Sequence, residues 1–420
     1  MHKLKDSLQV RNLSIERSPS GMAAGLLHLP GLVFLDSSSA EETASDHSNQ
    51  FAIIAARPTR HFEGNIHRPE SCEALRTALA ENQIEGFDLG FPVGGLIGGV
   101  DYHGEFQFSE YPEMLIFDYQ NDRWLEIGSL SAEFRSVERS FDKSLTFHDS
   151  TNREAFCNQV RKAIDYIASG DIYQVNLTHR FEAEWNGDQY NAFALYERLR
   201  EVSPAPFSGF FTFRDRVVLS ASPEQFLKIS GKVIETRPIK GTRPRFRDRE
   251  KDEKSAYDLI TSPKEIAELI MITDLERNDL GQVCEFGSVE ATELLKLERY
   301  AQVFHLVSTV QGTLREDVDH IEALQACFPG GSITGAPKKR AREIIDELES
   351  VPRGLYTGTL GCLGFNGESL FNIVIRTAIC EEDRIHFHVG AGIVADSNPE
   401  AEWEETLHKA AGIFRATGND

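Results

Sequence analysis

Hydrophobic and polar residues follow two different patterns along this chain, and the change comes near residue 150. Before it, short apolar runs such as Gly25 to Leu35 and Phe51 to Ala56 are separated by polar loops such as Asp36 to Gln50. Short apolar runs bounded by turn residues are typical of strands. We therefore expect residues 1–150 to form a sheet-rich N-terminal lobe.

Helical spacing begins after this point. Apolar residues recur at intervals of three and four from Phe156 to Ile167, and Gly170 follows as a stop signal. The segment from Tyr173 to Arg180 then predicts a strand, and helical and strand patterns alternate to the end of the chain. Residues 151–420 are predicted to form the second domain.

The charge of the chain limits its partners. It has 66 acidic and 44 basic residues and a net charge of −22, which repels polyanions and argues against nucleic acid or anionic membrane as a partner. The segment from Gly241 to Pro263 is dense in charges of both signs, and we interpret it as a solvated, mobile loop. An anionic substrate would need local positive charge or a metal ion.

Cysteine usage and apolar content indicate the compartment. The six cysteines are scattered and form no Cys-x-x-Cys pair, which predicts reduced thiols, with neither a zinc site nor a disulfide framework. No apolar run reaches membrane-spanning length, and Met1 to Asp6 precede no apolar leader stretch. We expect a cytoplasmic protein.

Lys240 is the first candidate for chemistry. It lies in Pro238 to Thr242, just after a predicted strand from Val233 to Thr236, and the proline and glycine predict a turn. Amines become nucleophiles when desolvation lowers their pKa, and scaffolds often present reactive groups at such turns. A lysine beside a turn is, on its own, more often a solvated surface charge. The interpretation therefore depends on residues further along the chain.

Two pairs of glutamates repeat one spacing. Glu265 and Glu268, and later Glu402 and Glu405, lie three residues apart, which places each pair on one face of a predicted helix. Two such helices can close around a hard cation such as Mg²⁺, which takes oxygen ligands. Glutamates on helices are more often solvated. The first pair has the better argument, because the apolar stretch from Leu269 to Ile272 would draw it inward.

Three glycine-rich segments lack the residues that would make them functional motifs. Gly330 to Lys338 has the glycine spacing of a phosphate loop, but Ala336 and Pro337 replace its Lys and its Ser or Thr, so we expect a helix to begin at Pro337 instead. Gly94 to Gly99 fits close strand packing better than dinucleotide binding. Gly361 to Gly364 lacks the first glycine of a nucleophile elbow. No cysteine glutaminase is predicted.

A longer series of motifs occurs in a characteristic order. It comprises Ser222-Pro223-Glu224, Pro238 to Thr242, Glu265 to Glu268, Asp274 to Gly281, His305 to Ser308, Ser332 to Lys338, Arg376 and Gly390 to Gly392. The series resembles the chorismate-binding enzymes, the family of anthranilate, isochorismate and aminodeoxychorismate synthases. The resemblance covers residues 150–420, and extends loosely to Leu29-Pro30-Gly31. It implies an α/β (α+β) fold, a large two-lobed sandwich of antiparallel-rich sheets flanked by helices, with the site between the sheets.

Three positions distinguish the reactions of that family. Family members that make 4-amino-4-deoxychorismate resemble this chain in carrying a lysine where Lys240 stands, whereas anthranilate synthases carry alanine. Members that add water place a lysine base where this chain has Gln174. His305 matches a histidine that is shared by members with different products. The resemblance therefore implies aminodeoxychorismate synthesis, with anthranilate synthesis as the alternative.

The resemblance also implies roles for individual residues. Lys240 would attack ring carbon 2 of chorismate, and Glu224 would protonate the hydroxyl that leaves carbon 4, which requires a raised pKa. Mg²⁺ would be held by Glu268 and Glu405, with Glu265 and Glu402 nearby. The implied contacts to substrate are Gly241, Thr242, His305, Thr334, Tyr356, Arg376, Gly390, Ala391 and Gly392.

Partners follow from the same resemblance. Because no glutaminase nucleophile is predicted in this chain, ammonia should come from a separate glutamine amidotransferase subunit, with free ammonium as a poor substitute. Conversion of the product to 4-aminobenzoate, on the way to folate, should need another enzyme.

Overall fold

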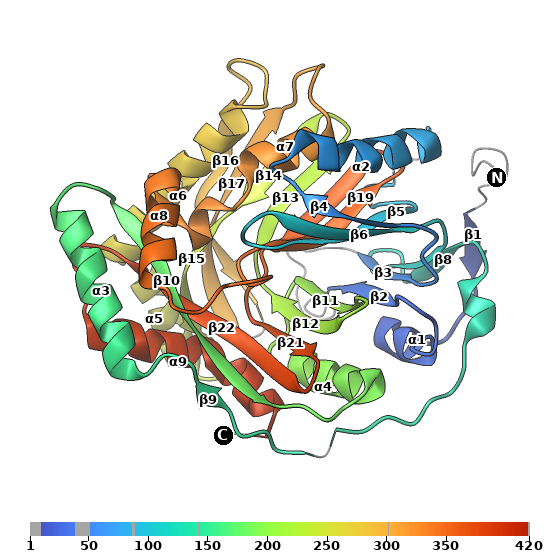
Figure 1. Ribbon diagram of the computed structural model, residues 1–420, viewed down its shortest axis with the longest axis horizontal. Helices are drawn as coiled ribbons and strands as arrows, with labels where there is room; N and C mark the ends of the chain where they lie inside the picture. Colours follow the sequence, from blue (N-terminus) through green and yellow to red (C-terminus); the bar gives the residue numbers. More distant parts are fainter. Residues whose placement is uncertain (1–9, 38–50, 86–88, 142, 301, 419–420) are drawn as a thin grey trace.

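Two large antiparallel sheets form the centre of the molecule (Figure 1). The computed structural model describes residues 10–37, 51–85, 89–141, 143–300 and 302–418. Residues 38–50, which are most of the polar loop predicted from Asp36 to Gln50, lie outside the described ranges. The mixed α/β architecture with antiparallel sheets and flanking helices confirms the predicted fold class.

The first sheet, sheet A, has twelve strands within the described ranges. In spatial order they are β1 (Arg11–Leu13), β8 (Arg123–Ile127), β7 (Met114–Asp118), β3 (Phe51–Ala55), β2 (Val33–Asp36), β11 (Phe207–Thr212), β12 (Arg216–Ser222), β21 (Thr377–Glu381), β22 (Arg384–Ile393), β10 (Gln174–Glu184) and β18 (Gly335–Ala336), with β9 (His148–Asp149) also paired to β10.

The second sheet, sheet B, has ten strands in the same described part of the chain. Their order is β15 (Ile239–Pro244), β17 (Val303–Thr313), β14 (Val233–Arg237), β13 (Gln225–Ser230), β20 (Glu368–Asn372), β19 (Thr359–Gly364), β5 (Gly95–Val100), β6 (Glu105–Tyr111) and β4 (His61–Asn65), with β16 (Glu290–Arg299) also paired to β17. Both sheets combine strands from before and after residue 150. The division into domains 1–150 and 151–420 stays a prediction.

The sheets pack face to face through an apolar core. Val33 and Ile53 of sheet A and Ile97 and Leu360 of sheet B belong to one buried cluster. Glycine permits the closest strand contacts, since a Cβ added at Gly98 would lie 2.0 Å from a backbone oxygen of β6. Close strand packing was the interpretation of this glycine-rich run, and the structure confirms it.

Helices cover the outer faces of the sheets (Figure 1). They are α1 (Pro19–Gly25), α2 (Pro69–Asn82), α3 (Arg153–Ala168), α4 (Gln189–Val202), α5 (Arg249–Ile260), α6 (Pro263–Gly281), α7 (His320–Cys327), α8 (Lys338–Leu348) and α9 (Pro399–Ala416), with the 3₁₀ turns η2 (Leu130–Glu133) and η3 (Gly331–Ile333). Helices α3, α8 and α9 pack on β10 and β22, whereas α5 and α6 pack on β15 and β17.

The interpretation of residues 241–263 as a mobile loop is wrong. β15 extends to Pro244, and α5 begins at Arg249, capped by the Asp248 carboxylate, which accepts the backbone N–H of Lys251. Leu259 anchors α5 because it is fully buried in a cluster with residues of α6 and β17. The charges lie on the outer face of a helix, where water solvates them without disordering the backbone.

Candidate active site

A cavity of about 980 Å³ lies between the two sheets and is closed by α6 and α9. We call it the large cavity. Most of the residues implicated by the sequence line it, namely Glu224, Lys240, Gly241, Thr242, Glu265, Glu268, His305, Tyr356, Arg376, Gly390, Gly392 and Glu405. These residues span nearly 200 positions of sequence and converge only in the folded chain.

Three residues of the sequence-based set lie behind the wall of this cavity. Thr334 is fully buried, and its hydroxyl donates to the Gly330 carbonyl at 2.9 Å. Ala391 is fully buried in the cluster beneath β10 and β22. Glu402 is 3% exposed and accepts from the Ser397 hydroxyl at 2.7 Å. Their side chains shape or support the site from behind.

Lys240 lies in a strand, and the prediction that it occupies a turn is wrong. It belongs to β15, and a bulge falls between Lys240 and Thr242, where Gly241 has φ +77°. Its Nζ donates to the Ser332 carbonyl at 3.3 Å. A Cβ added at Gly392 would lie 3.6 Å from the same Nζ, so the glycine on β22 leaves the amine room. The bulge therefore aims the lysine across the gap between the sheets.

Glu224 follows β12 and is 5% exposed. Burial raises the pKa of its carboxyl, although the nearby Ser332 side chain and the charge of Lys240 act in the opposite direction. The raised pKa is the property that a general acid needs near neutral pH. The amine of Lys240 and this carboxyl are thus placed on one side of the large cavity.

The capping residues of helices α6 and α9 fix where each helix begins, and so determine where each glutamate pair lies along its helix. The Ser262 hydroxyl caps α6 and Pro263 opens it, so that Glu265 falls in the first turn. The Asn398 side chain caps α9 in the same way and places Glu402 in its first turn. Glu268 follows one turn later and is 9% exposed.

Lys264 lies between the two helices. Its Nζ is 3.4 Å from Glu402 Oε1 and 3.9 Å from Glu268 Oε1. Burial lowers the pKa of Lys264, but the charges of Glu402 and Glu268 raise it by more. Glu405 is paired with Lys409 at 2.8 Å. Two lysines therefore balance the carboxylates at this end of the large cavity.

The carboxylates fit a hard cation in one respect. Glu268 Oε1 and Glu402 Oε2 are buried and have no hydrogen-bond partner within the described residues. Such atoms are costly unless a ligand or cation satisfies them. No three His, Cys, Asp or Glu side chains of the described ranges are already gathered as a metal centre. The residues thus offer oxygen donors for Mg²⁺ that would close around the ion when it binds.

Two further residues that line the large cavity are suited to binding an anion. Arg376, with φ +50°, has no ion-pair partner within the described part of the chain, and burial lowers the pKa of its guanidinium. Burial and Arg376 lower the pKa of His305 to about 3, so that its imidazole is neutral, and its Nδ1 contacts the Thr242 hydroxyl at 3.0 Å. A substrate carboxylate would supply the partner that Arg376 lacks.

Sequence reasoning missed several residues of the large cavity. Lys264 and Lys409 each lie four residues or fewer from a predicted glutamate, a spacing that places them on the same helical face. Asn176 and His388 lie on β10 and β22 and face the cavity. The alternation along β22 from Gly392 back to His388 was the signal that could have found the histidine.

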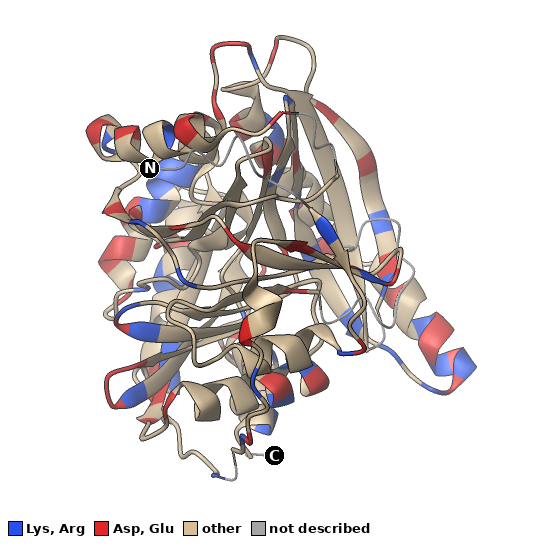
Figure 2. Cartoon of the chain, turned by 90° about the vertical axis from the view of Figure 1, so that its right-hand side faces the viewer, with Lys and Arg blue, Asp and Glu red and all other residues tan. Residues whose placement is uncertain are grey.

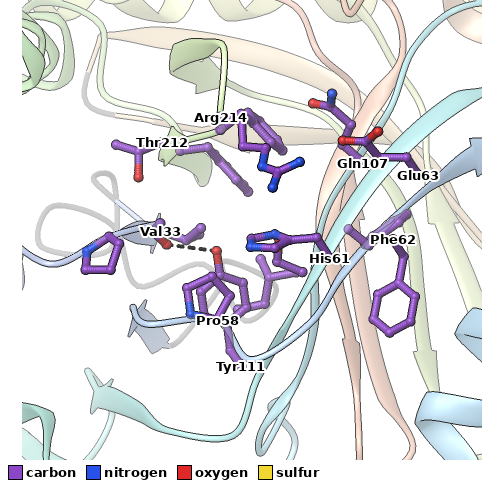
Figure 3. Close-up of a pocket in the computed structure, with 16 residues that line it drawn as sticks. Val33, Pro58, His61, Phe62, Glu63, Gln107, Tyr111, Thr212 and Arg214 are labelled. Carbon is purple, nitrogen blue, oxygen red and sulfur yellow. Dashed lines mark hydrogen bonds between the residues drawn. The ribbon is translucent and has the colours of Figure 1, made fainter.

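A second, smaller cavity of about 300 Å³ lies between β2 and β11 on one side and β4 and β6 on the other (Figure 3). His61 and Arg214 line it among apolar side chains, and His61 Nδ1 contacts the Ser109 hydroxyl at 2.8 Å. The Tyr111 hydroxyl closes its floor by donating to the Gly31 carbonyl at 2.8 Å. It contains none of the residues that the sequence implicated in chemistry, so the large cavity is the candidate active site.

Comparison with known proteins decides the family. Residues 50–415 match the profile described as chorismate binding enzyme. This chain belongs to that family. The chorismate-binding family is therefore shown for most of the chain, and the resemblance noted in the motifs is confirmed.

The relatives carry two different names. Aminodeoxychorismate synthase component 1 of Bacillus subtilis is 45% identical over 263 residues, which is 63% of this chain and 55% of that protein. Anthranilate synthase component 1 of Synechocystis is 44% identical over 284 residues, 65% of this chain and 55% of that protein. The matched regions thus span little more than half the length of these curated relatives.

Solved structures agree on the fold. Anthranilate synthase component I of Streptococcus pneumoniae superposes with a TM-score of 0.77 at 28% identity, covering 96% of this chain and all of that one. An isochorismate synthase of Bacillus anthracis has a TM-score of 0.74 at 22% identity, covering 95% of this chain and all of that one, and it supports the fold alone. No helix in the described residues is long and apolar enough to cross a membrane.

Proposed function

We propose that this protein is component I of an aminodeoxychorismate synthase, which replaces the hydroxyl at ring carbon 4 of chorismate with an amine. One observation carries the proposal. The amine of Lys240 projects into the large cavity beside Glu224, and its charge also acts on Glu268 and Glu405. A substrate bound between these carboxylates would lie within reach of a primary amine.

Lys240 is the proposed nucleophile. The lone pair of its Nζ bonds to ring carbon 2, and the two ring double bonds shift towards carbon 4. The oxygen at carbon 4 leaves as water with a proton from Glu224, and the Glu224 carboxylate takes up the proton that Nζ releases. Ammonia then attacks carbon 4, the double bonds shift back, and the bond to Lys240 breaks. The amine is thereby regenerated and the product is 4-amino-4-deoxychorismate. Covalent catalysis of this kind divides one difficult displacement into two easier steps.

Glu224 is the proposed acid for the first step. Hydroxide is a poor leaving group, so a proton must reach the oxygen at carbon 4 as its bond breaks. The burial that raises the pKa of Glu224 keeps a proton on the carboxyl at a pH where exposed glutamates have lost it. Its position in the same cavity as Lys240 supports the proposal that acid and nucleophile act on one bound ring.

The two ends of the large cavity would hold the two carboxylates of chorismate. Arg376, Tyr356, Gly241 and Thr242 line the cavity and would contact one of these carboxylates. Glu268 and Glu405, with Glu265 and Glu402 nearby, would hold Mg²⁺ at the other end. There the ion would neutralise the ring carboxylate and stabilise charge that develops on the ring.

Ammonia is proposed to come from a glutamine amidotransferase subunit. The relatives named component 1 imply such a second component. The six cysteines of this chain are all buried in the structure, which leaves none exposed to act as a glutaminase nucleophile within the described residues.

A product assay tests the function. Purified protein is incubated with chorismate, Mg²⁺ and ammonium, and the products are analysed by mass spectrometry. We expect a product that keeps the enolpyruvyl group and carries an amine in place of the hydroxyl. In Lys240→Ala this product should fall by about a hundredfold or more. Lys339→Ala is the matched control, because Lys339 is exposed on α8.

Anthranilate synthesis is the second candidate, and it is supported by the several relatives that are named anthranilate synthase component 1. It predicts a fluorescent aromatic product that has lost pyruvate. Anthranilate from the wild-type protein, at a rate unchanged by Lys240→Ala, would contradict the aminodeoxychorismate proposal and support this one.

A further inference from the structure

His388 is a buried histidine at the wall of the large cavity that the proposed reaction has not used. It lies on β22 two residues before Gly390, and side chains two apart on a strand face the same side. Gly390 and Gly392 line the large cavity with it. The imidazole is therefore the last full side chain on this face of β22 before the glycines that open the cavity.

Neither ring nitrogen of His388 is satisfied by the protein. Nδ1 and Nε2 are both buried without a hydrogen-bond partner within the described residues, and the side chain is 3% exposed. Buried polar atoms are nearly always paired in folded proteins, and an unpaired one lowers stability. Such a group in a cavity wall is satisfied when a ligand arrives.

Packing fixes the orientation of the imidazole. The ring of His388 stacks on Tyr356, with centroids 5.1 Å apart and planes inclined by 16°. Tyr356 and Arg376 also line the large cavity. The stacked rings therefore line the same cavity as the Arg376 guanidinium, which has no ion-pair partner within the described residues.

The charge state of His388 suits a neutral donor. Burial lowers its pKa well below the ordinary value, and the neighbouring His386 and Arg180 lower it further. A neutral imidazole carries one N–H donor and one acceptor. It can donate to a carboxylate without adding a further full positive charge to the cavity that Arg376 also lines.

We propose that His388 is a substrate-binding residue, and that one of its ring N–H groups donates a hydrogen bond to the chorismate carboxylate held by Arg376 and Tyr356. The proposal rests on chorismate as the substrate, and not on which ring carbon is aminated. It assigns to the stacked ring pair a role in binding the ground state of the substrate. His386, the next histidine on this face of β22, does not line the cavity and has no such role.

Equilibrium binding of chorismate tests this assignment. Calorimetry with Mg²⁺ and without ammonium measures affinity while amination cannot proceed. His388→Phe keeps a flat ring against Tyr356 but removes both nitrogens. His388→Asn and His388→Gln remove the ring but place an amide N–H near the position of Nδ1 or Nε2, respectively. His386→Phe is the matched control.

We expect chorismate affinity to fall in the variant that lacks an N–H donor at this position, and to be retained in a variant that keeps a donor but lacks the ring. The dissociation constant of His388→Phe should rise by about tenfold or more, the cost of removing a hydrogen bond to a charged group. At least one amide variant should recover most of that loss, and His386→Phe should bind as the wild type does. Thermal melting of each variant shows that it is folded.

Two outcomes would overturn the assignment. Wild-type affinity in folded His388→Phe would mean that the nitrogens do not touch the substrate. Equal losses in the phenylalanine and both amide variants would mean that only ring packing matters. If His388→Phe does not fold, His388→Leu takes its place as the variant without a ring N–H, and its affinity is compared with those of the amide variants in the same way. Failure of the wild-type protein to bind chorismate would instead refute the proposed function.

Discussion

At the scale of single residues, the chemistry depends on where burial places a charge. Glu224 and His305 line the same large cavity, yet burial raises the pKa of the carboxyl and lowers that of the imidazole. Both changes favour the neutral form. Burial in this cavity thus favours the protonated acid and the uncharged histidine, while Lys240 contributes the amine.

Removing the acid should separate binding from turnover. We expect Glu224→Gln to lower the turnover number for amination by about 10² to 10⁴, because the amide cannot protonate the leaving hydroxyl. Chorismate affinity should change little, since the amide keeps the shape of the carboxyl. Steady-state kinetics and calorimetry measure the two quantities. A loss of chorismate affinity as large as the loss of turnover would contradict the proposal that Glu224 is the general acid.

Gly392 gives a steric prediction at the same scale. A Cβ at this position would lie 3.2 Å from Gln174 Nε2 and 3.6 Å from Lys240 Nζ. Gly392→Ala should therefore crowd the amine and lower turnover by roughly tenfold, with little change in melting temperature. Gly367→Ala is not a suitable control, because its φ of +77° strains any side chain. Gly281→Ala, at an open helical position, is the better one.

At the scale of elements, helix α6 carries buried acids as well as the glutamates of the site. Glu276 is 3% exposed, and its Oε1 accepts the Gly331 N–H at 2.9 Å. That bond orders η3, which presents Ser332 to Lys240. Lys338 pairs with Asp279 at 2.5 Å one turn further along.

The buried acid makes stability depend on pH. Burial, and then the charge of Asp279, raise the pKa of Glu276. The folded protein therefore binds an extra proton above the unfolded pKa of about 4.3, and the stability associated with this group falls as pH rises towards the raised value. Glu276→Gln keeps the acceptor and removes the titration. Its melting temperature should exceed that of the wild type by about 2 °C or more at pH 8.

The comparison at pH 5 provides the internal control for this prediction. There Glu276 is protonated in the folded state, so variant and wild type should melt at nearly the same temperature. A difference that is equal at pH 5 and pH 8 would show that Glu276 does not titrate across this window.

How far the sequence predicts an element depends on whether its pattern is local. The glutamate pairs were found because helix spacing and capping residues act within one turn, as Ser262 and Asn398 do. Helix α5 was not predicted because its sequence is mostly charged. The buried leucine that anchors it packs against residues of other elements, and the local sequence does not show those contacts. Lys240 was found from its neighbours, but its bulge depends on pairing with β17, where its partner Leu306 is 66 residues away in sequence. His388 carries no local signal of its unpaired nitrogens.

At the scale of the whole molecule, acidic charge is spread over the outer helices and loops while the sheets are mostly uncharged (Figure 2). The net charge is −22, yet lysines gather around the glutamates of α6 and α9. These helices pack on different sheets, α6 on β17 and α9 on β22. A cation held between them would tie sheet B to sheet A.

Magnesium should therefore stabilise the whole fold. At a concentration about 100 times its dissociation constant, a ligand that binds only the folded state adds about 2.7 kcal/mol, and the melting temperature should rise accordingly. Glu268→Gln should abolish most of this rise. Glu400→Gln is the control, because Glu400 is exposed on α9 and pairs with Arg153. An equal rise in Glu268→Gln and wild type would place the ion elsewhere.

The cavity that holds Lys240 has one wall from each sheet, and its residues are drawn from Asn176 to Lys409. No early, local stage of folding can assemble it, since strands distant in sequence must pair first. During refolding from denaturant, helical circular dichroism should return before catalytic turnover does. The recovery of activity therefore reports the last step of folding, in which the two sheets of the sandwich reach their final register.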